Sequence, residues 1–495
     1  MAKRTASADL WPCREVDKEA FAAAAEALGR GDGELLALFA DGDCVHMALR
    51  GGGEAASIVT LKVQDGRYPS VGAHHAPAIR LERAIRDLFG FEPQGLPDER
   101  AWLDHGKWAI TMPLAEKRRL AREILDTGYA FLPTEGEGLH EIPVGPVHAG
   151  IIEPGHFRFT ANGETVVRLE ERLGYVHKGV ERLMAGAPLE QAAKLVGRVS
   201  GDSTVAYAYA FARAAEAALG AAAPARAAYL RALMAELERI ANHLGDFGAI
   251  CNDASFAALH AHAGVLREEV LQAADFAFCH RLMRDCIVPG GVAVNLKKEG
   301  EARLRALAAM IAARFPRLVA IYDDTPSLQD RMVTTGRVAP EFARRFAPGG
   351  YVGRAIGRDF DARRDFAYLP YDELAFDVPV LTEGDVNARV WIRIREIEQS
   401  LALIGQILDR LPGGAIHAAL PSVKEEREAA ALVEGFRGDI FVWLRLAGGK
   451  VARCHPRDPS WFQWPLLEAA VEGNIVADFP LCNKSFNCSY SGADL

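Results

Sequence analysis

Two periodicities of hydrophobic and polar residues divide the first part of the chain. Residues 17–30 and 77–90 place alanine, leucine and other apolar residues at the spacing of an amphipathic helix, and the second stretch lies between a proline and a glycine. Short apolar runs separated by glycine- and aspartate-rich turns, typical of strands, lie at 34–40, 44–50 and 56–63. This mixture predicts a small α+β domain over residues 1–132.

The pattern changes after residues 133–146, a segment dense in glycine, proline and glutamate that we interpret as a linker. The next stretch alternates on both sides of Asn162-Gly163, as expected of a β-hairpin. From about 187 to 286 the spacing of apolar residues is helical almost without interruption. The second part of the chain is therefore of a different kind from the first.

A further long helix is predicted over residues 385–411, where Pro412 and the glycines after it form a stop signal. The C-terminal region returns to strand-like runs and a final helix. We therefore predict an α+β fold class, in which residues 147–495 form a mostly α-helical domain with peripheral β-hairpins. The tail begins with another strand-like run at 474–481.

Composition narrows the class of protein. The 495 residues carry a net charge of -9 and contain no basic block, which argues against a nucleic-acid partner. The eight cysteines are scattered and do not suggest a disulfide framework, so a reducing compartment is expected. The N-terminus has no apolar segment typical of a secretory signal, and no apolar window is long enough to cross a membrane. These features predict a cytosolic protein that can dock onto a larger assembly.

Several histidines and cysteines are candidates for chemistry, and each has a plainer structural interpretation. Cys482 and Cys488 in the tail suggest a metal site, because thiolates are soft ligands for iron, nickel and zinc. Cys279 and Cys286 are seven residues apart in a helical stretch and would share a face, but free cysteines often pack as small hydrophobic residues. His243 is more readily interpreted as a hydrogen-bonded packing residue than as a ligand.

The segment 145–159 is a more specific candidate. It places His148, Glu153 and His156 in a loop interrupted by glycine and proline, next to the predicted hairpin, where functional groups often lie. Glu153, between an isoleucine and a proline, could be partly desolvated and relay protons. The alternative interpretation is an exposed loop acid. On the helix at 385–411, the charged residues are most simply read as ion pairs on a helix face: Arg389, Arg393, Arg395 and Glu396.

Several segments together resemble one protein family. They are LHEIPVGPVHAGIIEPGHFRF, RLGYVHKGVERLMAG, ELERIANHLGDFGAICNDA, VPGGVAVNL and FDVPVLTEGDVNAR. In this order they resemble the large subunit of energy-converting nickel–iron hydrogenases of the formate hydrogenlyase type, and the related quinone-site core subunit of respiratory complex I. The resemblance covers about 140–495. Residues 68–100 are similar to the small core subunit of complex I, which is fused to the large one in the formate hydrogenlyase type.

The resemblance also assigns ligand positions. The hydrogenases of this family hold nickel and iron through two Cys-x-x-Cys pairs, and four thiolates suit a soft bimetallic centre. In register, the first pair falls at Ser200 and Ser203, and the second at Ser489 and Gly492. Serine hydroxyls are poor substitutes for thiolates. We therefore expect no nickel–iron centre and no metal at these degenerate positions. A zinc or single-iron site at the two tail cysteines is a further alternative.

The complex I branch uses a histidine and a tyrosine at its quinone, and these positions hold Ile152 and Gly201 here. Two acids carry over: Glu153 matches the proton-relaying glutamate of the hydrogenases, and Asp253 matches an acid that partners the quinone histidine. The resemblance therefore implies a remnant cavity in which Glu153, His148 and Asp253 carry protons. The charged residues expected to contact a cofactor are Arg198, Asp202 and Arg389.

The family implies partners as well. We expect a hydrophilic-arm subunit of a hetero-oligomeric complex on the cytoplasmic side of the inner membrane, peripheral to the bilayer, that couples NADH- or quinone-linked electron transfer to proton or ion translocation. An iron–sulfur small subunit would supply electrons from a 4Fe-4S cluster, since this chain has no cluster motif. Membrane ion-translocating subunits would lie beneath it, and quinone is a candidate ligand. The alternatives are a non-catalytic coupling or scaffold subunit, and a true hydrogenase with an unusual metal site.

Overall fold

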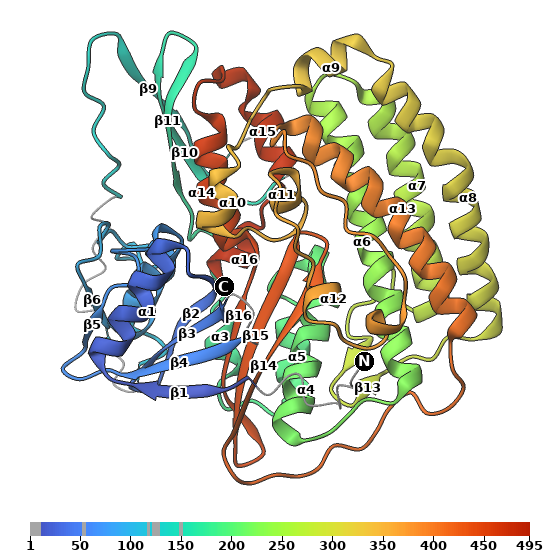
Figure 1. The fold of residues 1–495 in the computed structure, drawn as a ribbon, viewed down its shortest axis with the longest axis horizontal. Helices are drawn as coiled ribbons and strands as arrows, with labels where there is room; N and C mark the ends of the chain where they lie inside the picture. Colours follow the sequence, from blue (N-terminus) through green and yellow to red (C-terminus); the bar gives the residue numbers. More distant parts are fainter. Residues whose placement is uncertain (1–10, 52–55, 116–118, 121–128, 148–151) are drawn as a thin grey trace.

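The computed structural model describes residues 11–51, 56–115, 119–120, 129–147 and 152–495. Helices and strands are both abundant and largely segregated along the chain, which confirms the predicted α+β class. Figure 1 shows the N-terminal sheet as a unit on one side of the molecule, with the long helices on the other and the C-terminal strands between them.

The N-terminal unit is a four-stranded sheet in the order β1–β4–β3–β2. Helix α1 (Lys18–Arg30) begins where Asp17 accepts a hydrogen bond from the Ala20 amide, and α2 (Ile79–Phe89) ends at a glycine in the left-handed conformation. Both helices and the three longer strands confirm the predicted elements. The strands are β1 Cys13–Val16, β2 Gly33–Asp41, β3 Cys44–Gly51 and β4 Ser57–Lys62, followed by the short β5 Arg67–Pro69, β6 Glu92–Gln94, β7 Ile110–Thr111 and β8 Arg119–Leu120.

One face of this sheet packs directly against a C-terminal antiparallel sheet of β14 (Arg427–Gly435), β15 (Gly438–Ala447) and β16 (Lys450–Arg457). Phe39 of β2 lies at the contact. Its ring centroid is 4.6 Å from that of His455 and 5.1 Å from that of Trp443. One buried hydrophobic cluster contains side chains from both sheets. The two predicted domains therefore share buried apolar surface.

A three-stranded sheet lies where the sequence predicted a linker followed by a hairpin. β10 (His156–Asn162) and β11 (Thr165–Arg172) form the hairpin, with Gly163 in the left-handed conformation at the turn. β9 (Leu139–Val144) falls inside the predicted linker and pairs antiparallel with β10. Part of that linker is therefore an edge strand.

The long helices form the body of the second predicted domain. Helix α6 packs against both α7 and α13, and α5 packs against β14 and β15. The central position of α5 and α6 explains why alanine and leucine occupy almost every face of them. The longer helices are α4 Leu189–Val196, α5 Thr204–Leu219, α6 Ala225–Asp253, α7 Ala257–Phe278, α8 Lys298–Asp323 and α13 Val386–Arg410; the shorter ones are α3 Val180–Met184, α9 Pro326–Met332, α10 Glu341–Phe346, α11 Gly350–Ala355 and α12 Ala362–Asp365.

The C-terminal tail is helical. After α14 (Ser460–Val471), the run expected to be a strand instead forms a short turn and enters α15 (Phe479–Phe486), and the chain ends in α16 (Tyr490–Asp494). Pro480 lies in the first turn of α15, where its missing amide hydrogen costs no hydrogen bond. The strand expectation was wrong because an apolar run of that length fits a buried helix equally well.

The expectation that Cys279 and Cys286 share a helical face was also wrong. Helix α7 ends at Phe278, Cys279 adopts the left-handed conformation, and Cys286 directly precedes strand β12 (Ile287–Val288), which pairs with β13 (Gly291–Val292).

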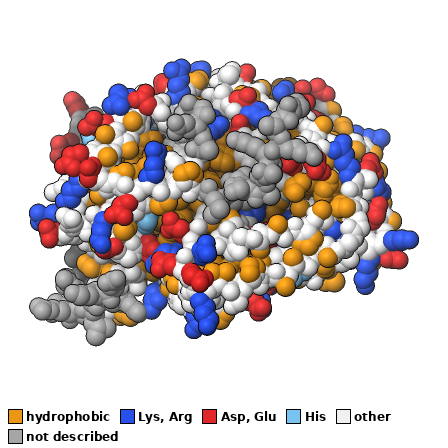
Figure 2. Space-filling model, turned by 60° about the horizontal axis from the view of Figure 1, so that its bottom comes forward, with side chains coloured by type: hydrophobic (Ala, Val, Ile, Leu, Met, Phe, Trp, Pro, Cys, Tyr) orange, Lys and Arg blue, Asp and Glu red, His pale blue; other side chains and the backbone are white. Residues whose placement is uncertain are grey.

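Among the described helices, none is long and apolar enough to cross a membrane. Acidic and basic side chains are interspersed on the face in Figure 2, unlike a basic nucleic-acid surface.

Candidate functional site: a buried serine pair at the C-terminus

The structure brings together two of the predicted ligand positions. Ser200 Oγ and Ser489 Oγ lie 2.9 Å apart, although 289 residues separate them in the chain. Both residues are almost fully buried, at 4% and 3% exposure. Ser200 directly precedes a 3-10 turn at the start of α5, and Ser489 caps α16 by accepting a hydrogen bond from the Gly492 amide at 2.9 Å. We call these two residues the serine pair.

The charged neighbours of the serine pair are Asp202 and Arg437. Ser200 Oγ donates a hydrogen bond to Asp202 Oδ1 at 2.8 Å, and Arg437 Nη1 donates to the same oxygen at 2.8 Å. Ser203, the other early ligand position, accepts a longer bond of 3.3 Å from Arg437. Burial alone raises the pKa of Asp202, but the guanidinium and these hydrogen bonds lower it to about 2. The carboxylate is therefore ionised at neutral pH.

The fourth ligand position, Gly492, faces Asp458. A Cβ atom at residue 492 would lie 2.5 Å from Asp458 Cγ, closer than real atoms approach. Asp458 itself accepts hydrogen bonds from Tyr207 Oη at 2.5 Å and from the Ser460 amide at 2.8 Å. The space beside the serine pair is thus filled by protein groups that satisfy one another.

The two tail cysteines are buried. Burial raises the pKa of Cys482 to about 12 and that of Cys488 well above its usual value, so both are neutral thiols at neutral pH. Cys488 Sγ contacts Gln463 Oε1 at 4.0 Å. Within the described ranges, no group of three or more histidine, cysteine, aspartate or glutamate side chains could hold a metal ion.

Glu153, one of the predicted proton carriers, contacts the last helix of the chain. It is exposed and accepts a hydrogen bond at 3.1 Å from the amide of Ser491, two residues after Ser489. His148 lies outside the described residues. Glu153 thus lies beside the helix that Ser489 caps.

Asp253 lies at the end of α6 and is half-buried. Burial raises the pKa of its carboxyl group, and the nearby Lys484, Asn252 and His260 partly offset the rise. These neighbours do not include the serine pair. Between described residues no hydrogen bond joins Asp253 to Glu153 or to the serine pair, and its place in a shared cavity stays a prediction.

The other predicted cofactor contacts already have protein partners. Arg198 forms a bidentate ion pair with Asp285, with Nη2 2.7 Å from Oδ2. Arg389 is fully buried, and its three nitrogens donate to Ser485 Oγ, the Gly384 carbonyl and the Gly336 carbonyl at 2.8–2.9 Å. Burial lowers the pKa of Arg389 to about 10, because no carboxylate of the described residues contacts it directly. Of the three predicted cofactor contacts, Asp202 is the one that touches the serine pair.

A cavity of about 100 Å³ lies beside Asp202, between α6 and α7. Its wall includes Glu238, whose carboxylate accepts hydrogen bonds from the Val205 and Ala206 amides at 2.7 and 3.1 Å. Burial raises the pKa of Glu238 to about 8, so this acid is mostly protonated at neutral pH. The cavity has room for several water molecules. It brings a second titratable acid close to the site.

The sequence did not identify Arg437, Asp458, Tyr207 or Glu238 as site residues. Arg437 lies in the tight turn between β14 and β15, and Asp458 lies at the turn into α14. The one available signal was Asp458-Pro459-Ser460, a turn-and-cap sequence that typically precedes a helix. Arg437 and Asp458 are far from Ser200 along the chain, so no local pattern links them to the site.

The long helical body follows the N-terminal α+β unit, and the last helix of the chain returns to the start of α5. Residues 256–428 match the family model described as respiratory-chain NADH dehydrogenase, 49 Kd subunit. The chain is 32% identical over 445 residues to formate hydrogenlyase subunit 5 of Escherichia coli (strain K12), covering 88% of this chain and 78% of that protein. The chain belongs to this family, which confirms the resemblance seen in the sequence.

Two further relatives are chains of respiratory oxidoreductases. One subunit of the NADH-quinone oxidoreductase of Roseiflexus sp. (strain RS-1) is 32% identical, covering 68% of this chain and 94% of that protein. A chain of the membrane-bound sulfane sulfur reductase, described as an archaeal respiratory membrane complex, superimposes with a TM-score of 0.68 at 26% identity. That likeness covers 72% of this chain and 99% of the other. This chain is thus an oxidoreductase-family subunit of the kind found in membrane respiratory complexes.

Proposed function

We propose that this chain is the peripheral large subunit of a membrane-bound, complex I-like oxidoreductase that works without a nickel–iron centre. The observation that carries the proposal is the direct hydrogen bond between Ser200 and Ser489, at the positions where the family's hydrogenases have thiolate ligands. A hydroxyl that is hydrogen-bonded to another hydroxyl and to a carboxylate is a neutral group. It does not supply the anionic sulfur that a soft metal centre requires.

The neighbouring groups do not fit a nickel–iron centre either. Gly492 has no room for a ligating side chain, because Asp458 occupies that space. Cys482 and Cys488 are neutral thiols, and Cys488 contacts Gln463. We therefore derive no step through nickel or iron bound to this chain, and a true hydrogenase with an unusual metal site is not favoured by these contacts.

The residues present are suited to moving protons. Asp202, Ser200 and Ser489 form a continuous hydrogen-bonded chain, and hydroxyls can both donate and accept. The cavity beside Asp202 lies at one end of this hydrogen-bonded chain; Glu153 is not itself part of that chain but accepts from the amide of Ser491, two residues after Ser489. In this proposal the electrons arrive from a 4Fe-4S cluster of a partner small subunit, and the serine pair supplies protons to the acceptor.

Two acceptor classes follow from the relatives. The name of the NADH-quinone oxidoreductase relatives suggests a quinone, and the name of the solved sulfane sulfur reductase suggests sulfane sulfur.

The membrane subunits beneath would use the reaction to translocate protons or other ions. The cytoplasmic side of the membrane is the expected location. A non-catalytic coupling subunit is the second candidate, favoured by how completely protein groups fill the site around Asp458.

The test uses the intact complex purified from its native membrane. Nickel content is measured by elemental analysis, and the turnover of a quinone and of polysulfide is measured for the wild type and for Ser489→Ala. We expect no stoichiometric nickel, turnover of one acceptor and at least a tenfold loss in the variant. Ser327→Ala, an exposed serine on α9, is the matched control and should retain full activity.

Stoichiometric nickel would overturn the proposal. Wild-type-like turnover by an assembled Ser489→Ala complex would instead favour the coupling subunit, because a scaffold needs no proton path through the serine pair.

A further inference from the structure

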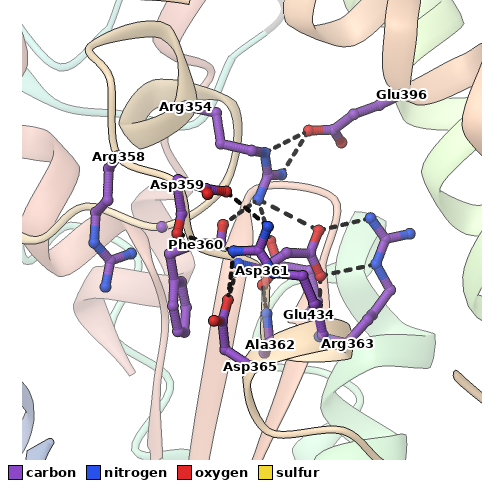
Figure 3. A network of polar contacts seen from close by, with 12 residues as sticks. Arg354, Arg358, Asp359, Phe360, Asp361, Ala362, Arg363, Asp365, Glu396 and Glu434 are labelled. Atoms are coloured by element: carbon purple, nitrogen blue, oxygen red, sulfur yellow. Dashed lines mark hydrogen bonds and ion pairs between the residues drawn. The ribbon is translucent and has the colours of Figure 1, made fainter. Parts of the chain in front are cut away.

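A second cluster of buried charged side chains lies between α6, α11, α13 and β14 (Figure 3). Each member is at most 2% exposed. None of them belongs to the serine pair or its direct partners. We call the cluster the core ion network; it consists of Arg239, Arg354, Arg363, Glu236, Asp361, Glu396 and Glu434.

Arg354 joins two acids of the network that come from different elements. Its Nε donates to Glu396 Oε1 of α13 at 2.9 Å, and its Nη1 donates to Glu434 Oε1 of β14 at 3.0 Å. The other oxygen of Glu434 accepts a hydrogen bond from the Ala362 amide at 3.0 Å. Figure 3 shows the Arg354 side chain pointing between these two carboxylates.

Arg363 joins the other two acids. It donates to Asp361 Oδ2 at 2.7 Å and to Glu236 Oε1 at 3.0 Å. Glu236 also accepts hydrogen bonds of 2.6 Å from the hydroxyls of Tyr371 and Ser400. With this many donors, Glu236 is held as a carboxylate, and its pKa is lowered despite its burial.

Arg239 closes the network, with Nη1 3.5 Å from Glu396 and Nε 3.4 Å from Glu236. His243, one turn further along α6, lies with Nε2 2.7 Å from Glu396 Oε2. This contact agrees with the interpretation of His243 as a hydrogen-bonded packing residue. It also places one neutral, titratable ring against the network.

The formal charges of the network do not balance. Its described members comprise four carboxylates and three guanidinium groups, which leaves one negative charge in a region closed to water. Two neighbouring guanidinium groups of the described residues have their own carboxylates: Arg457 is paired with Asp439, and Arg393 with Asp246. An unpaired buried charge is costly, and such groups usually take up or release a proton instead. One bound proton would make the network neutral.

Glu434 is the acid best placed to hold that proton. Burial and the nearby Asp361 raise the pKa of Glu434 to about 7, although Arg354 opposes the rise. Glu434 has one guanidinium partner, whereas Glu396 has two and a histidine besides. The charged groups facing Glu434 come from three elements and the loop before α12: Arg239, Arg354, Asp361 and Asp439.

His243 is the other group able to take the proton, and its surroundings disfavour it. Burial lowers the pKa of His243, and Arg393 and Arg239 lower it further, against the opposing effect of Glu396. The Tyr351 ring packs against its edge with the centroids 5.9 Å apart. The imidazole is therefore expected to stay neutral.

We propose that the core ion network is a proton-binding site that holds one titratable proton on Glu434. If the proposed oxidoreductase function is correct, the network is a second proton store of the subunit, separate from the serine pair. Hydrogen bonds connect the core ion network to the serine pair through α13. Arg393, three residues before Glu396, donates to Asp246. Asp246 also accepts a hydrogen bond from the side chain of Asn487 at 2.9 Å. Asn487 in turn accepts from Arg437, the partner of Asp202.

Infrared difference spectroscopy of the resting complex tests the proposal, because a protonated carboxylic acid has a carbonyl band separate from those of carboxylates. We expect a buried acid band in the wild type that disappears as the pH rises through about 7. Glu434→Gln should remove the Glu434 component of this band, whereas the component of Glu82, another buried acid with a pKa raised to about 7, should remain. Glu238→Gln is the matched control; it should remove a different band, with a midpoint near pH 8, and leave the first one intact.

A second variant tests the charge balance directly. Asp361→Asn reduces the network to three acids and three guanidinium groups, so Glu434 should ionise and its component of the neutral-pH band should be lost although Glu434 is still present. The proposal is overturned if the folded wild type has no such band, if Glu434→Gln leaves the band undiminished, or if nitrogen NMR finds His243 protonated in its place. These spectra measure no turnover. Their outcome is therefore independent of the nickel and acceptor measurements that test the proposed function.

Discussion

Asp458 occupies the space into which a side chain at Gly492 would project. A Cβ atom at residue 492 would lie 2.5 Å from Asp458 Cγ and 2.6 Å from Oδ2. The carboxylate cannot retreat easily, because Tyr207 and the Ser460 amide hold it by hydrogen bonds. The closing helix can therefore approach the start of α14 only because residue 492 has no side chain.

Gly492→Ala should consequently destabilise the protein. The added methyl group overpacks a rigid site, which typically costs about 1–3 kcal/mol. Gly413→Ala is the matched control, since nothing lies within 4 Å of a Cβ atom there. Urea unfolding of both variants measures the difference in the free energy of unfolding, and equal stabilities would contradict the steric argument.

Asp202→Asn should weaken both the fold and the proton path. It leaves the nearly buried guanidinium of Arg437 without its carboxylate, at a cost of about 1–3 kcal/mol. The pKa of Asp202 is lowered from 3.8 to about 2 in the folded protein. Its stabilising contribution is therefore complete above about pH 4 and is lost as the pH falls toward 2.

Chemical unfolding at several acidic pH values measures this contribution. The comparison variant is Asp285→Asn, which breaks the half-exposed ion pair with Arg198 and should cost less than about 1 kcal/mol. Equal losses in the two variants would mean that Arg437 does not depend on Asp202.

Arg389→Lys should be more harmful than a charge-conserving change usually is. A lysine keeps the positive charge but cannot reach Ser485, Gly384 and Gly336 together with the same planar geometry. Leaving one buried acceptor unpaired costs about 1–3 kcal/mol. The thermal midpoint should fall, whereas Arg395→Lys, at an exposed position of the same helix, should leave it unchanged.

Glu238→Gln should alter the pH dependence of stability. The pKa of Glu238 is raised from 4.5 to about 8 by burial, so the folded protein keeps a proton that the unfolded chain releases. Stability from this group is present at low pH and declines between about pH 4.5 and 8, by at most about 1.4 kcal/mol per pH unit. The variant should lack that part of the slope.

Measurements of the unfolding free energy from pH 5 to pH 8 show whether the slope changes. Glu268→Gln, in an exposed ion pair with Arg281, should behave like the wild type. If the unfolding free energy depends on pH identically in all three proteins, Glu238 does not keep a proton in the folded state.

Local signals predicted local elements well. The amphipathic spacing of residues 17–30 predicted α1, and Asn162-Gly163 predicted the hairpin turn. The register of the family resemblance predicted that Ser200 and Ser489 belong to one site, and the structure places them in contact. Arg437 and Asp458 could not be predicted in this way, because their relation to Ser200 arises only from the packing of the sheet and tail.

The charges on α13 show the same limit. A pattern of arginine and glutamate on one helix suggests pairs along its surface, yet Arg393 bonds to Asp246 of α6 and Glu396 bonds to Arg354 of α11. The local interpretation was wrong for these two residues because α13 is enclosed by other helices. Helical spacing reveals which residues share a face but not whether that face meets solvent or another element.

The stacking of Phe39 on His455 has a consequence for assembly. Two sheets that bury each other's apolar faces within one polypeptide meet at an effective concentration that no dilution can lower. The N-terminal unit thus covers the C-terminal sheet and is covalently joined to it through the chain. Separating the N-terminal unit from the rest of the chain by proteolysis or truncation would expose an apolar surface on each part. Either part expressed alone should therefore aggregate.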